Sequence, residues 1–518
     1  MSVDKLRGSK HINLIAPSDI GLLMSAQSYR PEITQAIRKI KSLNWRPLRD
    51  LVINTISPGP HPKYGGGYPC LKTKNVDGLL ATHEPADYAD ASVFKDLSKV
   101  TVKKGDLLIN LTGAGSIGRV SVYYGDDKPI TNQHIARMSV KATADEGYLA
   151  CFLRSWWGER ALEQGVAGST GQINMVNEHV RSIPVYLPDT LAQKYIGDKV
   201  RQAEQLRAWA KRLDSFIDDR FSFLVQDLPS PKKHFSVKPE DLVPYRINPK
   251  QYDPIVTGAI SKAEKSGVLL ERLEGLIDAR GIAGGATPKG AEYKTSGVLF
   301  CRVQNVKKLA LDLSDAVYIT KDDDESLKRS RCESYDVVLT ITGYPGTASL
   351  VIEEDLPVNL NQHSVRFGCA ESIKPGYLCA AVNSSFVKLQ VERASIGGTR
   401  DALDYPSVAN LLIPRLHASL EDAIDRAAIS YVRAIKASKK LTDSAKTLVE
   451  ALIEGQLSER QLIQAQQALD DGDNSLDQAI LSKLSNAGYA IDGATPLFSD
   501  IDELYRLLES AAQAEIEG

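Results

Sequence analysis

Two short patterns in this chain combine residue types that can do chemistry. The first is Gly113-Ala-Gly115-Ser-Ile-Gly118, which has the G-x-G-x-x-G spacing of loops that bring backbone N–H groups close to a pyrophosphate. The second is Asn-Gln-His, found at 132–134 and again at 361–363, in which the histidine has the side chain that most often acts as a general base. The sequence around each pattern decides between these chemical roles and structural ones.

The sequence around the glycine loop favours a hairpin. A dinucleotide fingerprint needs a helix that opens at the loop and an acidic residue about 20 positions further on. Instead, "VSVYYGDDKPI" follows Arg119, and its β-branched and aromatic residues predict a second strand that ends in a turn. We therefore interpret the loop as the connection between two strands. The alternative function is a nucleotide-binding enzyme that uses Gly113 to Gly118.

The Asn-Gln-His pattern has no recognisable catalytic neighbours. No Ser, Cys or carboxylate recurs beside it in a known motif, and Asn and Gln side chains readily bind backbone groups at turns. We therefore interpret Asn132, Gln133, Asn361 and Gln362 as structural, together with the two histidines. The sequence also lacks a P-loop, an Asn-Pro-Pro-aromatic methylation motif and a Cys/His cluster with zinc spacing.

The chain contains an internal duplication, with an offset of about 223 to 230 residues. Three pairs of segments carry it: "GDLLINLTGAGSIG" at 105–118 with "YDVVLTITGYPGTA" at 335–348, "ITNQHIARMSV" from 130 with "NLNQHSVRFGC" from 359, and "GYLACFLRS" from 147 with "GYLCAAVNS" from 376. Upstream, Tyr29-Arg30-Pro31 matches Tyr252-Asp253-Pro254. An offset of this size predicts two domains in tandem rather than a solenoid.

Each copy ends in a long helical pattern. After Pro188 and after Pro414, apolar residues recur at steps of three to four, which predicts two amphipathic helices. One apolar stripe must be buried against another element, either the helix's own domain or the second helix. The predicted fold class is α+β, with two globular mixed α/β domains in tandem repeat separated by long antiparallel coiled-coil-like helices. The predicted parts are 1–188 (first domain), 189–227 (first helix), 228–250 (linker), 251–414 (second domain), 415–455 (second helix) and 456–518 (acidic C-terminal helical extension).

Length and charge limit the partners. A chain of 518 residues exceeds one hydrophobic core, and it has neither a run of 18 apolar residues nor the apolar core of a signal peptide, so we expect a cytoplasmic protein with no membrane partner. Residues 456–518 hold 12 acidic and 3 basic side chains, a net charge of −9, and the preceding residues carry +7 of the overall −2. A basic body is compatible with a nucleic-acid partner, whereas phosphates would repel the tail. We expect the tail to bind protein, and its removal to leave DNA recognition unchanged.

The repeated segments resemble the specificity (S) subunit of type I restriction-modification systems. In that family, each target recognition domain begins like "SGGTP…Y…GIPWIRIKDI", continues with "GDILISLTG", reaches "NQ" and ends in "GSGQ…I…LPLPPLAEQ". The second copy matches the beginning of this pattern with "AGGATPKGAEYKTSGVLFCRVQNV" at 283–306. The first copy matches its end with "AGSTGQINMVNEHVRSIPVYLPDTLAQKYI" at 167–196. The second copy departs from the pattern after Thr399, where Arg400 and Asp401 follow and the downstream Gln is missing.

This resemblance implies a non-catalytic subunit that binds double-stranded DNA. Each of its two target recognition domains would read one half of a split, asymmetric site, and the long helices would be the spacer. Two methyltransferase (M) subunits would dock on it and methylate adenine with S-adenosylmethionine. A restriction or translocase (R) subunit, or another defence protein, is the further expected partner, and the chain itself would hold no cofactor and no metal.

The resemblance also implies where DNA is contacted. The family approaches DNA with glycine-rich loops and the strands that follow them, and DNA is read by Arg, Lys, Asn, Gln or aromatic side chains at such exposed positions. The candidates are Lys63, Tyr64, Lys72 and Lys74 in the first copy, and Thr287, Lys289, Tyr293, Arg302, Gln304 and Arg400 in the second. Surface solvation is the alternative role of each lysine.

Overall fold

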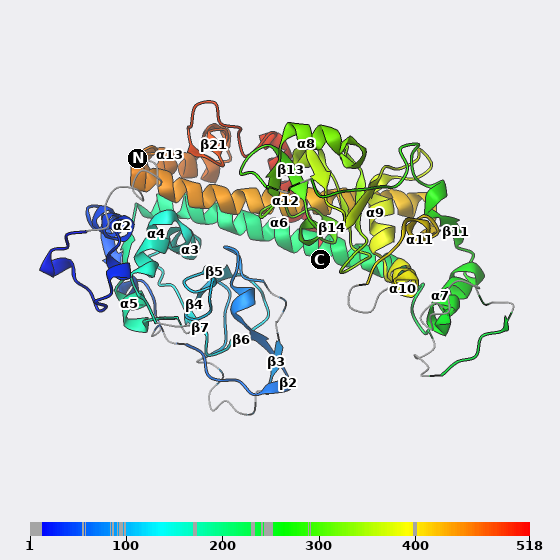
Figure 1. Ribbon diagram of the computed structural model, residues 1–518. Helices are drawn as coiled ribbons and strands as arrows, with labels where there is room; N and C mark the ends of the chain where they lie inside the picture. The colour runs from blue at the N-terminus through cyan, green and yellow to red at the C-terminus, as the bar shows by residue number, and fades with distance from the viewer. Residues whose placement is uncertain are drawn as a thin grey trace. The chain divides into compact units, whose positions relative to one another are not determined.

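The computed structural model describes most of the chain, in two compact units. The described residues are 13–53, 56, 58–82, 84, 87–90, 92, 97, 100–168, 173–228, 234–239, 242, 252–288, 290, 292–396 and 401–517. Unit 1 is Met1–Leu206 with Ala437–Gly518, and unit 2 is Arg207–Lys436. The division falls inside two long helices, so each unit contains an α/β part and a portion of both helices (Figure 1).

The α/β part of unit 1 is enclosed by a pair of short strands, β1 and β10, which are antiparallel. Inside it, β4 lies between β5 and β7, and a second sheet has the order β3-β2-β6. The bounds are α2 (Pro31–Lys41), β1 (Trp45–Pro47), β2 (Tyr64–Leu71), β3 (Asp87–Ala89), β4 (Asp106–Asn110), β5 (Val120–Tyr123), β6 (Ile130–Thr131), β7 (Ile135–Met138), α3 (Glu146–Arg154), α4 (Trp156–Glu163), β8 (Val166–Ala167), β9 (Asn174–Met175), α5 (Asn177–Ser182) and β10 (Pro184–Tyr186).

Unit 2 repeats this plan. The pair β11–β20 encloses its α/β part, β16 lies between β17 and β19, and a second sheet has the order β15-β13-β18. The bounds are α7 (Pro254–Lys265), β11 (Leu269–Arg272), β12 (Ala283–Gly284), β13 (Val298–Cys301), β14 (Leu309–Ala310), β15 (Val317–Ile319), α8 (Lys321–Ser326), β16 (Val337–Thr340), β17 (Ala348–Leu350), β18 (Val358–Leu360), β19 (Ser364–Phe367), α9 (Pro375–Asn383), α10 (Ser385–Ala394), α11 (Tyr405–Ala409) and β20 (Leu412–Arg415).

The repeated sequence segments thus form the same elements in both units. Both first helices begin at the proline of the repeated Tyr-x-Pro, a residue whose fixed φ suits the first helical turn. The glycine loop joins the antiparallel strands β4 and β5, as the sequence predicts, and its counterpart joins β16 and β17. The strands of these central sheets are almost wholly buried and apolar, so they form the core of each α/β part.

The two long amphipathic helices are confirmed as helices, α6 (Thr190–Ser222) and α12 (Ala418–Glu454). Within unit 1, the Ser438 hydroxyl of α12 donates a hydrogen bond of 2.7 Å to the Ala203 carbonyl of α6. Within unit 2, Phe221 of α6 and Val432 of α12 belong to one buried cluster, which also includes core residues of the α/β part. The two helices therefore contact each other in unit 1, and in unit 2 both pack on the core of the α/β part.

The repeated Gly-Tyr-Leu segment docks each α/β part onto a long helix. A Cβ at Gly197 of α6 would lie 1.9 Å from Oδ1 of Asp145, and a Cβ at Gly147 would lie 2.9 Å from the Gly197 Cα. In unit 2, a Cβ at Gly376 would lie 2.6 Å from the carbonyl oxygen of Asp425 in α12. The neighbouring tyrosine hydroxyls donate to strand-end carbonyls, Tyr148 to Tyr186 at 2.7 Å and Tyr377 to Pro414 at 2.5 Å.

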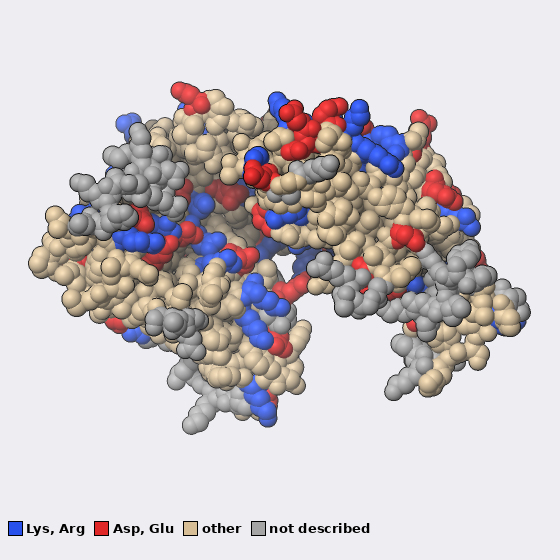
Figure 2. All heavy atoms as spheres, in the orientation of Figure 1, with Lys and Arg blue, Asp and Glu red and all other residues tan. Residues whose placement is uncertain are grey.

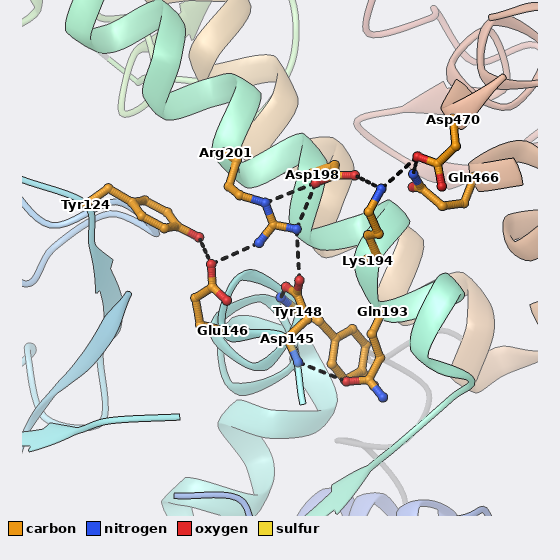
Figure 3. Close-up of polar contacts among 10 residues, drawn as sticks. All are labelled: Tyr124, Asp145, Glu146, Tyr148, Gln193, Lys194, Asp198, Arg201, Gln466 and Asp470. Atoms are coloured by element: carbon orange, nitrogen blue, oxygen red, sulfur yellow. Dashed lines mark hydrogen bonds and ion pairs between the residues drawn. The ribbon is translucent and has the colours of Figure 1, made fainter. Parts of the chain in front are cut away.

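Arg201 of α6 holds this docking contact in unit 1 (Figure 3). Its guanidinium donates to Asp145 at 2.8 Å, to Glu146 at 2.9 Å and to Asp198 at 3.0 Å. Burial opposes charge on Arg201, but the carboxylates of Asp145 and Asp198 outweigh it and raise the pKa of the guanidinium. The Tyr124 hydroxyl, just beyond β5, donates to Glu146 at 3.0 Å, so the network also reaches the central sheet.

The acidic C-terminal segment belongs to unit 1. It forms α13 (Glu459–Asp470), α14 (Ser475–Leu481), β21 (Leu484–Ser485), β22 (Gly488–Tyr489) and α15 (Ile501–Glu517). Asp477 lies 2.7 Å from Nζ of Lys199 on α6, and each of these two side chains is only 1% exposed. The hydroxyls of Tyr195 and Tyr505 also donate to Asp477, both at 2.5 Å.

Further carboxylates of this segment bind the same region. Glu459 accepts hydrogen bonds from the Tyr186 hydroxyl and the Asp189 backbone, and Asp470 pairs with Lys194 at 2.9 Å. The segment is therefore a structural layer on α6, and we expect its removal to destabilise unit 1. The expectation that deletion leaves the recognised DNA sequence unchanged stays a prediction.

No helix among the described residues has the length and apolarity needed to cross a membrane.

The buried pair predicts a large effect of Asp477→Ala. This change leaves the Lys199 ammonium buried without its counter-charge, and breaking a buried pair in this way costs about 3–5 kcal/mol. Urea unfolding should show the loss, and limited proteolysis should cleave the C-terminal segment earlier. Asp492→Ala, at an exposed position of the same segment, is the control and should unfold like the unmodified chain. Equal stability of the two variants would show that the pair does not hold the segment.

Candidate nucleic-acid interface

The repeated motifs of each copy meet at one end of its central sheet, which we call the motif edge. In unit 1, the Gly59 N–H donates to the Ile135 carbonyl at 3.0 Å and the Leu111 N–H to the His134 carbonyl at 2.8 Å. In unit 2, the corresponding bonds run from Gly285 to Ser364 at 3.2 Å and from Ile341 to His363 at 2.9 Å. The isolated β-bridges Thr112–Asn174 and Thr342–Ala402 connect the last repeated segment of each copy to this edge. The motif edge comprises Gly59, Thr112, His134 and Asn174 in unit 1, and Gly285, Thr342, His363 and Ala402 in unit 2.

The Asn-Gln-His segments form the turns of this edge. The side-chain oxygen of Asn132 accepts the His134 backbone N–H at 3.1 Å, and Asn361 does the same for His363 at 3.1 Å. The His134 ring contacts the Thr112 hydroxyl at 2.7 Å. The structural role predicted for the two asparagines is thus confirmed by the bonds that they make to the backbone.

The glycine loop does not have the strand–loop–helix arrangement of a dinucleotide fingerprint. It connects the antiparallel strands β4 and β5, so no helix begins at the loop itself. A pocket of about 620 Å³ lies beside Gly115 and Gly118 and contains three arginines. Each arginine is near a carboxylate: Arg30 is 2.6 Å from Glu163, Arg154 is 4.0 Å from Glu159, and Arg119 pairs with Asp77. The described residues also contain no group of His, Cys, Asp and Glu that could hold a metal ion.

The first-copy candidates lie on and around strand β2. Lys63, Tyr64 and Lys74 are exposed, whereas Lys72 is half-buried and lies 2.6 Å from Asp87 on β3. This hydrogen bond raises the pKa of Lys72 and lowers that of Asp87. The Lys72 Nζ also lies 4.1 Å from the centre of the Tyr64 ring, within cation–π range.

Further basic side chains surround β2. The Tyr68 hydroxyl donates to the carbonyl of Lys128, an exposed lysine beyond the end of β5. Figure 2 shows Lys and Arg side chains gathered over the region of β2, β3 and β6, with fewer Asp and Glu among them. A surface of this kind attracts phosphates.

The second-copy candidates are divided between exposed and paired side chains. Arg302 lies 3.3 Å from Asp315, and Gln304 donates to the same carboxylate at 2.8 Å, which lowers its pKa. Thr287 is exposed and its hydroxyl donates to the Gln362 side chain, and Tyr293 is 42% exposed. Lys289 and Arg400 lie outside the described residues. The structure therefore brings Thr287 to the motif edge, while Arg302 and Gln304 are tied to Asp315.

One exposed residue at the motif edge was missed from sequence. Tyr344 is in the connection between β16 and β17 and is 84% exposed. The signal was its position in the repeat: the first copy has Ala114 between two glycines, where the second has a tyrosine. The spacing of this segment predicts a connection between two strands and does not indicate which side chains its tip displays.

The motif edge predicts that Gly285 tolerates no side chain. A Cβ there would lie 2.1 Å from the Leu360 carbonyl oxygen, so Gly285→Ala must displace the loop from the sheet. Overpacking of this kind costs about 1–3 kcal/mol. Urea unfolding measures it, with Gly275→Ala as the control, because a Cβ at Gly275 meets nothing within 4 Å. If Gly285→Ala and Gly275→Ala unfold at the same urea concentration, the Leu360 carbonyl oxygen does not lie as close to residue 285 as described.

No protein-family model matches this chain, and none of the curated proteins is significantly similar to it. Among solved structures, it is similar to the type I restriction-modification system S subunit from M. genitalium, with 12% identity and a TM-score of 0.42, over 79% of this chain and 95% of that chain. It is also similar to the HsdS subunit from Thermoanaerobacter tengcongensis, with 14% identity and a TM-score of 0.25, over 83% and 96% of the two chains. A chain from a study of complex assembly and conformational transition of the type I R-M system has 13% identity and a TM-score of 0.28, over 80% and 98%.

Proposed function

We propose that this chain is the DNA-recognition subunit of a type I restriction-modification system or of a related methylation-based defence complex. Unit 1 and unit 2 each read one half of a split, asymmetric site on double-stranded DNA. Methyltransferase subunits, two per chain, dock on it and methylate adenine with S-adenosylmethionine, and an R subunit or another defence protein completes the complex. The chain itself is a non-catalytic subunit.

The observation that carries this proposal is the pair of motif edges. Both have the same backbone hydrogen bonds and the same bridges, and the Asn-Gln-His turns recur in both, whereas the tips of the glycine loops differ, with Ala114 in one and Tyr344 in the other. A duplicated reader must keep its backbone frame and vary the side chains at exposed positions in order to recognise two different sequences. The sequence motifs that resemble the S subunit lie on these same loops.

We assign two roles to the acidic segment. Glu459 accepts hydrogen bonds from Tyr186 and Asp189, and Asp470 and Asp477 pair with Lys194 and Lys199 of α6, so these carboxylates are not available to a partner. The remaining exposed acids, such as Asp492, Asp502 and Glu509, still repel DNA. We assign the exposed face of the segment to a protein partner and its inner face to the stability of unit 1.

Exchange of the two α/β parts tests the split-site model. The strand pairs β1–β10 and β11–β20 enclose residues 45–186 and 269–415, which gives natural junctions. A chain that carries 269–415 in both places should select, from random duplexes, a sequence in which the second half-site occurs twice. The reverse exchange is the matched control and should duplicate the first half-site. Selection of both original halves by either chain would contradict the model.

The exposed lysines predict a salt effect. If Lys74 contacts a phosphate, Lys74→Ala should weaken binding to all duplexes and reduce the slope of log K against log salt by about 1. Lys63→Ala should act alike. Lys483→Ala, at an exposed lysine of the C-terminal segment, is the control and should leave the slope unchanged. An unchanged slope in the Lys63 and Lys74 variants would exclude these two lysines from the interface.

A further inference from the structure

Tyr344 has an unusual place among the tyrosines of this chain. Its exposure of 84% compares with 38% to 48% for the other exposed tyrosines among the described residues, Tyr64, Tyr88, Tyr293 and Tyr405. An exposed phenol ring does not obtain the favourable free energy that burial of its apolar surface would give. A folded chain therefore usually covers most of such a ring. An aromatic side chain displayed in this way is typical of a contact surface.

The backbone that carries Tyr344 is fixed on both sides. The Thr340 hydroxyl donates to the Tyr344 carbonyl at 2.7 Å and accepts the Thr347 N–H at 3.0 Å. The Gly343 N–H donates to the Asp401 carbonyl at 3.0 Å, and Gly346 packs so closely that a Cβ would lie 3.0 Å from a Val391 methyl. The ring is therefore exposed on an ordered tip rather than on a loose loop, which reduces the entropy that a contact must overcome.

The same tip in unit 1 carries no ring. The Thr112–Asn174 bridge matches Thr342–Ala402, but the exposed position that corresponds to Tyr344 is Ala114. The two tips thus share a backbone and differ in the side chain presented. The other tip residues of unit 2 are Gly343, Pro345, Gly346 and Thr347, which do not provide the apolar surround of a protein hot spot.

We propose that Tyr344 is a base-contacting residue of unit 2, whose ring lies against base edges in a groove of duplex DNA. This inference rests on the proposed function and names one of its specificity residues. A two-stranded hairpin fits the major groove, where an aromatic side chain makes apolar contact with the thymine methyl group and a hydroxyl can reach a base edge. Thr287 and Gln362, whose side chains are hydrogen-bonded to each other, belong to the segments that form the same motif edge.

Binding measurements on the full-length chain, purified from its own cells with the proteins that accompany it, test the inference. The unmodified chain first selects its sequence from random duplexes. Tyr344→Ala should then bind the selected duplex about tenfold to a hundredfold more weakly and a scrambled duplex equally well. Tyr344→Phe should retain most of the affinity, because the ring is kept. Leu269→Ala, at a residue of β11 that is 61% exposed, is the matched control and should bind both duplexes normally.

A photocrosslinking amino acid, p-benzoylphenylalanine, gives an independent readout at the same positions. At 344 it should crosslink to DNA within one half-site, and at 269 it should not. Crosslinking of position 344 to a protein instead of DNA, or equal affinity of Tyr344→Ala for the selected duplex, would overturn the assignment of Tyr344 alone. If the unmodified chain selects no split sequence, the proposed function fails, and this inference fails with it.

Discussion

The arrangement of each unit depends on one close contact between a short helix and a long one. Gly147 and Gly376, at the start of α3 and α9, lie against the eighth residue of α6 and of α12, respectively. A side chain added at Gly147 would overlap the backbone of Gly197, and one added at Gly376 would overlap the backbone carbonyl of Asp425. Because the next residue is a tyrosine whose hydroxyl holds the closing strand pair, this contact also orients the α/β part that carries the motif edge.

The two units stabilise the same contact with different charges. In unit 1, Arg201 brings Asp145, the residue that caps α3, onto α6. In unit 2, Asp425 of α12 itself accepts the Gly376 N–H at 2.8 Å, and Lys374 pairs with Asp422 at 2.7 Å. The Lys374–Asp422 pair is exposed and screened by solvent, so the close approach of the backbones, and not the charges, is the shared requirement. The duplication has therefore kept a geometry and exchanged the residues that secure it.

Local patterns in the sequence were sufficient to predict several secondary-structure elements. The β4–β5 hairpin, the two long helices and the turn role of Asn132 and Asn361 follow from spacing of two or of three to four residues and from turn chemistry, which act within a few positions. The destination of the acidic segment could not be predicted in the same way. Asp477 meets Lys199 across 278 residues of chain, and nothing in the local sequence distinguishes this buried aspartate from its exposed neighbours.

Contacts between residues distant in sequence also decide which of the candidate DNA-binding residues are paired with an acid. Lys72 and Arg302 occupy corresponding positions after β2 and β13, and each meets an acid, Asp87 or Asp315, at 2.6 and 3.3 Å. Beside each lies an asparagine, Asn75 or Asn305, that accepts a backbone N–H at 2.9 Å and shapes the turn.

Lys72 and Arg302 meet an acid in the same way in both copies, so they belong to the frame that the two units share. Under the proposed function, an arrangement that recurs with its partners would not distinguish two half-sites. Discrimination would come from positions where the frame is equal and the side chains differ, as they do at Ala114 and Tyr344.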